Sequence, residues 1–211
     1  MNRVSKNVHL GVLLGLALAV STAQAELNAP KLDTLMVWTC SGPFTQEYQV
    51  KVMKIDGDVV TYQGTRDEES YWVEKHAWLT GTTLWSTKSG SRFQWFDKED
   101  FHNYAKLEPG TRFKGAVPAR DGDDKWVWDY LITVDEPQTI EHALLGKVQI
   151  VPITEKRRIY HGTYWSSMVS YVLPREGLTV RWIYEDPNGV EDCDLTGLHA
   201  NGQIITKTRP D

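Results

Sequence analysis

The polar residues with the most suggestive spacing lie in the segment YWVEKHAW, residues 71–78. Alternate residues of an extended strand share one face, which groups four side chains of this segment: Trp72, Glu74, His76 and Trp78. A carboxylate and an imidazole two residues apart could act as an acid–base pair, and the indoles could hold a sugar or an ammonium group. A solvated strand face whose tryptophans pack on a neighbouring strand fits the same spacing.

Two other polar groups resemble known sites less well. Ser166 and Ser167 lack the G-x-S-x-G elbow of a nucleophilic serine, so we interpret them as polar strand positions. Asp121, Asp123 and Asp124 lack the spacing of an EF-hand calcium loop, which leaves a polar hairpin turn. No pair of histidines in the expected mature chain has H-x-x-x-H or H-E-x-x-H spacing, and no phosphate-binding glycine loop occurs. We therefore expect neither a metal nor a cofactor.

The run EKRR, residues 155–158, is a short cluster of charge. Its plain interpretation is a solvated strand end. A second interpretation is a contact with an anionic surface.

The first 25 residues have the pattern of a secretory signal peptide. Arg3 and Lys6 precede a short apolar run from Leu10 to Val20, and Ala23-Gln24-Ala25 is typical of a cleavage site. The apolar run is too short to span a bilayer, and no later segment is long enough either. We expect a mature chain of residues 26–211, located in the periplasm or secreted, without a transmembrane segment.

The charge balance bears on the class of partner. The full chain carries 23 basic and 28 acidic residues, a net charge of -5. Cleavage would remove two basic residues and no acidic ones, which moves the net charge to -7. A nucleic-acid-binding protein needs a basic face to meet phosphates, so we do not expect a nucleic acid as partner.

Cys40 and Cys193 are the only cysteines in the chain. In an exported protein two cysteines most economically form a disulfide. Two distant cysteines do not make a zinc site, and a redox pair would be expected as C-x-x-C. We therefore predict that Cys40 and Cys193 are paired.

Hydrophobic periodicity indicates an all-β protein. In KWVWDYLITV, residues 125–134, the apolar residues alternate and define one strongly apolar strand face. The segments 48–55 and 178–185 alternate in the same way. Residues 98–107 suggest a short helix or an irregular turn. We therefore expect an antiparallel meander that forms a barrel-like or curved sandwich body, with few or no helices.

Turn signals divide the meander. Asp56-Gly57 is typical of a two-residue hairpin, and Asp186-Pro187-Asn188-Gly189 and LPREG, residues 173–177, separate other strands. Residues 107–110, LEPG, are the best internal boundary. We expect a single β-rich domain, with two lobes over residues 38–107 and 111–198 as an alternative.

Residues 110–195 resemble a group of uncharacterised exported bacterial β-proteins. The strand KWVWDYLITV is followed by YWSSMVSYVLPREGLTVRWIYEDPNG, which is similar to a WYSPELG-like strand and turn before a valine-rich strand. The resemblance implies an antiparallel, barrel-like fold at the cell envelope. It brings no catalytic residue with it.

Three functions fit the sequence. Our main hypothesis is a non-enzymatic exported protein that binds a sugar, a lipid or an envelope protein. The alternatives are a periplasmic hydrolase that uses Glu74 and His76, and a structural envelope factor. Of the nine tryptophans, Trp128 is expected in a filled core, while Trp165 and Trp182 are expected at a rim that a ligand can reach.

Export can be tested on the mature protein. Mass spectrometry of the periplasmic fraction should find Glu26 at the N-terminus. Recovery of a full-length product embedded in the membrane would contradict the predicted signal peptide.

Overall fold

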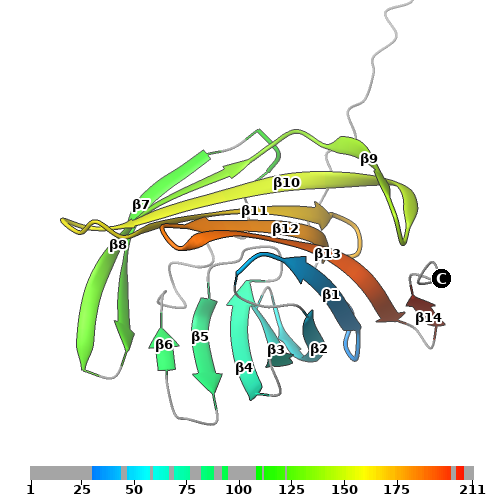
Figure 1. Ribbon diagram of the computed structural model, residues 1–211, viewed down its shortest axis with the longest axis horizontal. Helices are drawn as coiled ribbons and strands as arrows, with labels where there is room; N and C mark the ends of the chain where they lie inside the picture. Colours follow the sequence, from blue (N-terminus) through cyan, green and yellow to red (C-terminus); the bar gives the residue numbers. More distant parts are fainter. Residues whose placement is uncertain are drawn as a thin grey trace, which may run out of the picture.

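The computed structural model describes residues 30–43, 47–57, 59–66, 69–76, 82–87, 92–94, 108–110, 112–121, 123–200 and 203–206. Within these ranges all regular structure is β-strand, which confirms the predicted all-β class (Figure 1). The expected signal peptide and residues 98–107 lie outside the described residues. The described part of the chain contains no helix long and apolar enough to cross a bilayer.

The described residues form fourteen strands in one antiparallel sheet. The strands are β1 (Leu35–Ser41), β2 (Glu47–Asp56), β3 (Val59–Arg66), β4 (Glu69–His76), β5 (Thr82–Thr87), β6 (Arg92–Gln94), β7 (Arg112–Asp121), β8 (Asp124–Val134), β9 (Gln138–His142), β10 (Gly146–Ile159), β11 (Trp165–Leu173), β12 (Leu178–Asp186), β13 (Gly189–Ala200) and β14 (Gln203–Thr206).

Most strands pair with the strands before and after them in the sequence. The exception is β9, which pairs with the first half of β10 while β8 pairs with the second half. Strand β1 pairs with β2 on one side and with β13 on the other, so the series of paired strands returns to its start. In Figure 1, β10, β11 and β12 cross the upper part of the curved, sandwich-like body, and β2 to β6 lie below them.

Alternation along the strands places the core on one face of the sheet. On β8, Trp128, Tyr130, Ile132 and Val134 are all buried, whereas Val127 and Asp129, on either side of Trp128, are exposed. Strand β2 shows the same alternation from residue 47 to residue 52, where Val52 is fully buried, and its last four residues are exposed. The predicted apolar strand faces are therefore confirmed, because a period of two sends successive side chains to opposite faces.

Predicted turns close several hairpins. Asp56 pairs with Val59, so the loop begins at Gly57, whose φ of 58° lies in the left-handed region that glycine tolerates. Leu173 pairs with Leu178 across the predicted LPREG turn. Asp186 pairs with Gly189 around the predicted Pro187-Asn188 loop. The hairpin signals were correct because each rests on local backbone preference.

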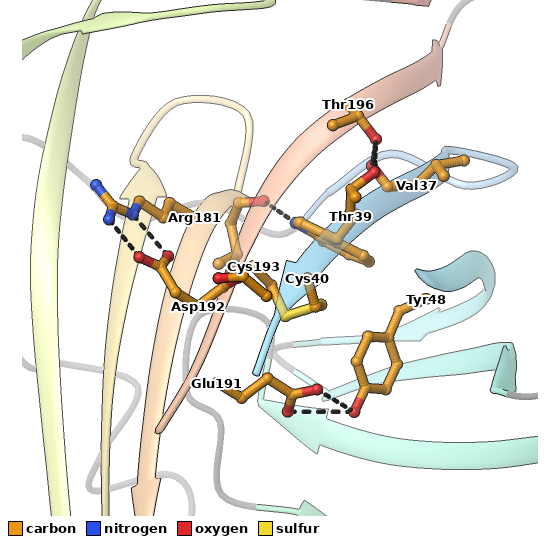
Figure 2. The surroundings of a disulfide bond; sticks show 12 residues. Val37, Thr39, Cys40, Tyr48, Arg181, Glu191, Asp192, Cys193 and Thr196 are labelled. Atoms are coloured by element: carbon orange, nitrogen blue, oxygen red, sulfur yellow. Dashed lines mark hydrogen bonds and ion pairs between the residues drawn. A yellow bond between two sulfur atoms is a disulfide. The ribbon is translucent and has the colours of Figure 1, made fainter. Parts of the chain in front are cut away.

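The predicted disulfide joins Cys40 to Cys193 across 153 residues. The two cysteines are directly paired between β1 and β13, and both are buried. Beside them the buried Glu191 accepts a hydrogen bond from the Tyr48 hydroxyl at 3.3 Å, which links β13 to β2 (Figure 2). The disulfide therefore holds the two strands that complete the series of pairings.

Removal of the disulfide should weaken the fold. We expect Cys40→Ser together with Cys193→Ser to lower the free energy of unfolding by about 2–5 kcal/mol, because the unfolded chain is freed from a very long covalent loop. Urea denaturation of the oxidised protein and the double variant measures this difference. Equal midpoints and slopes for the two proteins would contradict the expectation.

Candidate ligand-binding groove

Five strands contribute side chains to one row on the outer face of the sheet. Strand register places Lys114, on β7, beside Leu131, on β8. Lys156, on β10, follows beside Leu131, and Ser167, on β11, follows beside Lys156. Glu185, on β12, completes the row beside Ser167. All five positions alternate with inward-facing residues, so their side chains lie on the face opposite the core.

A second row carries an exposed indole. Asp129 lies opposite Arg158, and Arg158 lies opposite Trp165 at the start of β11. Trp165 is 38% exposed. Beyond this row the Tyr160 amide donates a hydrogen bond to the Val127 carbonyl, and the Tyr160 side chain is 55% exposed. Large aromatic groups are thus left in contact with water at this end of the sheet.

The two rows border an open groove of about 490 Å³. Its lining comes from both rows and from the residues between them: Lys114, Asp129, Tyr130, Leu131, Lys156, Arg157, Arg158, Trp165, Ser166, Ser167 and Glu185. Of the lining residues whose side chains face outward, three are basic (Lys114, Lys156 and Arg158) and two are acidic (Asp129 and Glu185). The groove therefore has an excess of positive charge in a chain whose net charge is -5.

Polar contacts on the inner face fix the strands that carry the groove. Arg157 donates a hydrogen bond from Nε to Ser166 Oγ at 2.6 Å, and its guanidinium lies 5.6 Å from the centre of the Trp128 ring. The Tyr130 hydroxyl donates to the buried carboxylate of Glu155. These contacts tie β8, β10 and β11 together directly beneath the exposed residues. Ser166 is accordingly a polar strand residue, as predicted, and its side chain is buried.

A second polar network holds the beginning of β11. The Tyr164 hydroxyl is 2.9 Å from the Tyr184 hydroxyl and donates to Asp186 Oδ2 at 3.0 Å. The Asn188 amide donates to Asp186 Oδ1 at 2.7 Å. Tyr164 precedes Trp165 in the chain, so this network anchors the backbone from which the exposed indole projects.

Hydrogen bonding sets the charge state of this network. Burial alone would raise the pKa of the Asp186 carboxylate. Hydrogen bonds from Asn188, Tyr164 and Tyr184 favour the charged form more strongly, so the pKa of Asp186 lies below the ordinary 3.8. Burial, together with the contacts to Tyr184 and Asp186, raises the pKa of the Tyr164 phenol. Asp186 is therefore an ionised carboxylate over the neutral pH range, and the Tyr164 hydroxyl that donates to it stays protonated.

The structure separates the residues that the sequence proposed as a site. Trp165 lines the groove, but Trp182 lies opposite Ser170, five residues farther along β11, or roughly 16 Å away at the usual rise of a strand. The Trp182 ring packs edge-on against Tyr48, with ring centres 5.4 Å apart. The two tryptophans therefore do not share one rim.

The other proposed group lies on β4. The backbone positions of Trp72, Glu74 and His76 pair with Gln63, Thr61 and Val59 of β3. Trp78 lies outside the described residues. The proposal that these four residues form a site stays a prediction.

Sequence reasoning missed most of the groove, although one signal was present. In the charged run EKRR, Glu155 and Arg157 face inward and make the contacts described above. Lys156 and Arg158 face outward and line the groove. A solvated strand end therefore describes only half of the run. Lys114 and Asp129 reach the groove through strand register, which the local sequence does not reveal.

Comparison with known proteins gives structural relatives but no family. No protein-family model matches the chain, and no curated protein matches its sequence. The hypothetical lipoprotein YmcC from Escherichia coli is similar in structure, with a TM-score of 0.50 and 9% identity over 77% of this chain and 82% of that chain. This likeness shows a shared fold and leaves the activity open.

Two further structures give lower scores. An exported-protein candidate with a YmcC-like fold from Bacteroides fragilis has a TM-score of 0.45 and 11% identity, and the match covers 85% of this chain and 99% of that one. A lipoprotein candidate from Parabacteroides distasonis has a TM-score of 0.41 and 11% identity, with coverage of 86% and 99%.

The network around Asp186 predicts a pH-dependent stability. Asp186→Asn should lower the free energy of unfolding at pH 7 by about 1–2 kcal/mol, because hydrogen bonds to an ionised group are lost. The folded pKa is depressed, so this contribution is present above pH 3.8 and is lost as the pH falls through the folded value. Urea titrations between pH 7 and pH 3 should show the two proteins converging.

The exposed residue Asp135 provides a matched control. Asp135→Asn removes the same charge and should leave the free energy of unfolding at pH 7 close to that of the wild type. A gap between the wild type and Asp186→Asn that stays constant down to pH 3 would contradict the assignment.

Proposed function

We propose that this chain is an exported, non-enzymatic binding protein and that its ligand lies in the outer groove beside Trp165. The observation that carries the proposal is a partly exposed indole set among basic side chains on a concave surface. The signal-peptide pattern and the buried disulfide support export, since disulfides persist in oxidising compartments.

The surroundings of Trp165 favour a binding role over simple packing. Trp128 is buried in the core and is surrounded by other aromatic residues, whereas Trp165 projects from the opposite face. A large apolar ring in water gains free energy when a ligand covers it. Concave surfaces with an aromatic wall and a few polar groups are typical of binding sites for small molecules.

The groove is also built to be rigid. Its side chains project from paired strands, and the Tyr164–Asp186 network fixes the beginning of β11. A site that is preorganised by strands and buried hydrogen bonds loses less entropy on binding than one on mobile loops. The inner-face contacts of Arg157 and Glu155 therefore support binding, although they face away from the ligand.

Fluorine NMR tests where ligands bind. We would label the protein with 5-fluorotryptophan and assign Trp165 and Trp182 from Trp→Phe variants. The probes are pentagalacturonate, cellopentaose and phosphatidylglycerol vesicles. At least one probe should shift or broaden the Trp165 resonance while the Trp182 resonance stays unchanged, because Trp182 packs on Tyr48 far from the groove. No change at Trp165 with any of the three probes would contradict the proposed function.

Stability measurements separate the two classes of tryptophan. Trp128→Ala should lower the free energy of unfolding by about 3–5 kcal/mol, because it leaves a cavity in the core. Trp165→Ala should lower the free energy of unfolding by about 1 kcal/mol or less, since surface substitutions seldom cost more. It should abolish binding of the probe that shifts the Trp165 resonance in the labelled protein. An equal loss of stability in both variants would assign Trp165 to the core.

A further inference from the structure

We infer that the ligand of this groove is an acidic saccharide, an oligomer of sugar rings that carries carboxylate or other anionic groups. This inference rests on the proposed function and names its ligand class. It is drawn from the arrangement of three kinds of groups in the two outer rows: an indole, separated basic residues, and carboxylates beside a hydroxyl.

The indole supplies a flat apolar surface. A sugar ring has one face rich in C–H groups, which can lie against an aromatic ring, while its hydroxyls point outward. Trp165 presents such a surface and is directly opposite Arg158. A ring bound on the indole therefore has a guanidinium at its side, in position to meet an anionic substituent by charge-assisted hydrogen bonds.

The basic residues are spread along the groove. Lys156 is two residues from Arg158 on β10, roughly 7 Å away at the usual strand rise, and Lys114 lies two strands from Lys156, about 10 Å away at the usual strand spacing. One compact anion suits such a spread less well than a chain with a charge on successive units. The spacing therefore favours an extended ligand with repeated anionic groups.

The acidic residues narrow the ligand class further. Asp129 and Glu185 line the same groove, and Ser167 lies between Lys156 and Glu185. Carboxylates and a hydroxyl accept hydrogen bonds from the hydroxyl groups of a sugar. The phosphates of a nucleic acid and the acyl chain of a lipid offer these acceptors no hydrogen-bond donor. Mixed charge beside an indole thus matches a ligand that has hydroxyls, anionic groups and ring faces together.

A pair of lysines on one strand allows a controlled test. Lys156 lines the groove, whereas Lys147 is exposed near the opposite end of β10, nine residues or roughly 30 Å away. Calorimetric titration would measure the affinity of Lys156→Gln and Lys147→Gln for pentagalacturonate, with cellopentaose as the neutral probe and phosphatidylglycerol vesicles as the lipid probe. Both variants change the net charge equally, so the general field of the protein is controlled.

The acidic probe should bind the wild type and Lys147→Gln with similar affinity. Lys156→Gln should bind it roughly tenfold more weakly, the effect of losing about one charged hydrogen bond, and added salt should weaken binding to the wild type. Equal binding of cellopentaose and pentagalacturonate, or no effect of Lys156→Gln, would overturn the inference.

Binding of the vesicles alone would also overturn the inference, because the ligand would then be a lipid surface. In each of these cases a response of Trp165 would still uphold the proposed function. A Trp165 resonance that stays unchanged with every probe would contradict both the proposed function and the inference.

Discussion

The pairing of β1 with β13 is the constraint on which the rest of the structure depends. It joins strands whose cysteines are 153 residues apart, and the Cys40–Cys193 disulfide makes that pairing covalent. Because β1 also pairs with β2, the sheet has to curve, and curvature gives it one enclosed face. The apolar side chains of β2, β8 and β12 fill that face. The charged side chains of β7, β8 and β10 that point to the opposite face remain outside, where they line the groove.

Alternation lets one short segment serve both faces of the sheet. Residues 155–158 of β10 send a glutamate and an arginine inward and a lysine and an arginine outward. The inward pair contacts Tyr130 and Ser166, and these hydrogen bonds satisfy polar side chains that face the core. The outward pair is exposed; Arg158 Nε donates to the Gly162 carbonyl at 3.4 Å, and the other N–H groups of its guanidinium can donate to a ligand. Packing and binding are therefore coupled through the backbone of a single strand.

The sequence was informative about local structure and much less so about the site. The alternation in KWVWDYLITV and the turns at Gly57 and Gly189 follow from local preferences, so strands, hairpins and fold class could be predicted. The groove depends on register between strands far apart in the sequence: Lys114, Asp129 and Arg158 meet only after β7, β8 and β10 are aligned. Register also separates Trp165 from Trp182: Trp182 lies opposite Ser170 and packs on Tyr48, whereas Trp165 lines the groove.

A structure of the complex tests the central claim most directly, namely that the outer groove holds an acidic saccharide. Crystals grown with pentagalacturonate should show a sugar ring stacked on Trp165 and at least one carboxylate within hydrogen-bonding distance of Arg158 or Lys156. A saccharide bound instead beside Glu74 and His76 of β4, with Trp165 uncovered, would contradict the account.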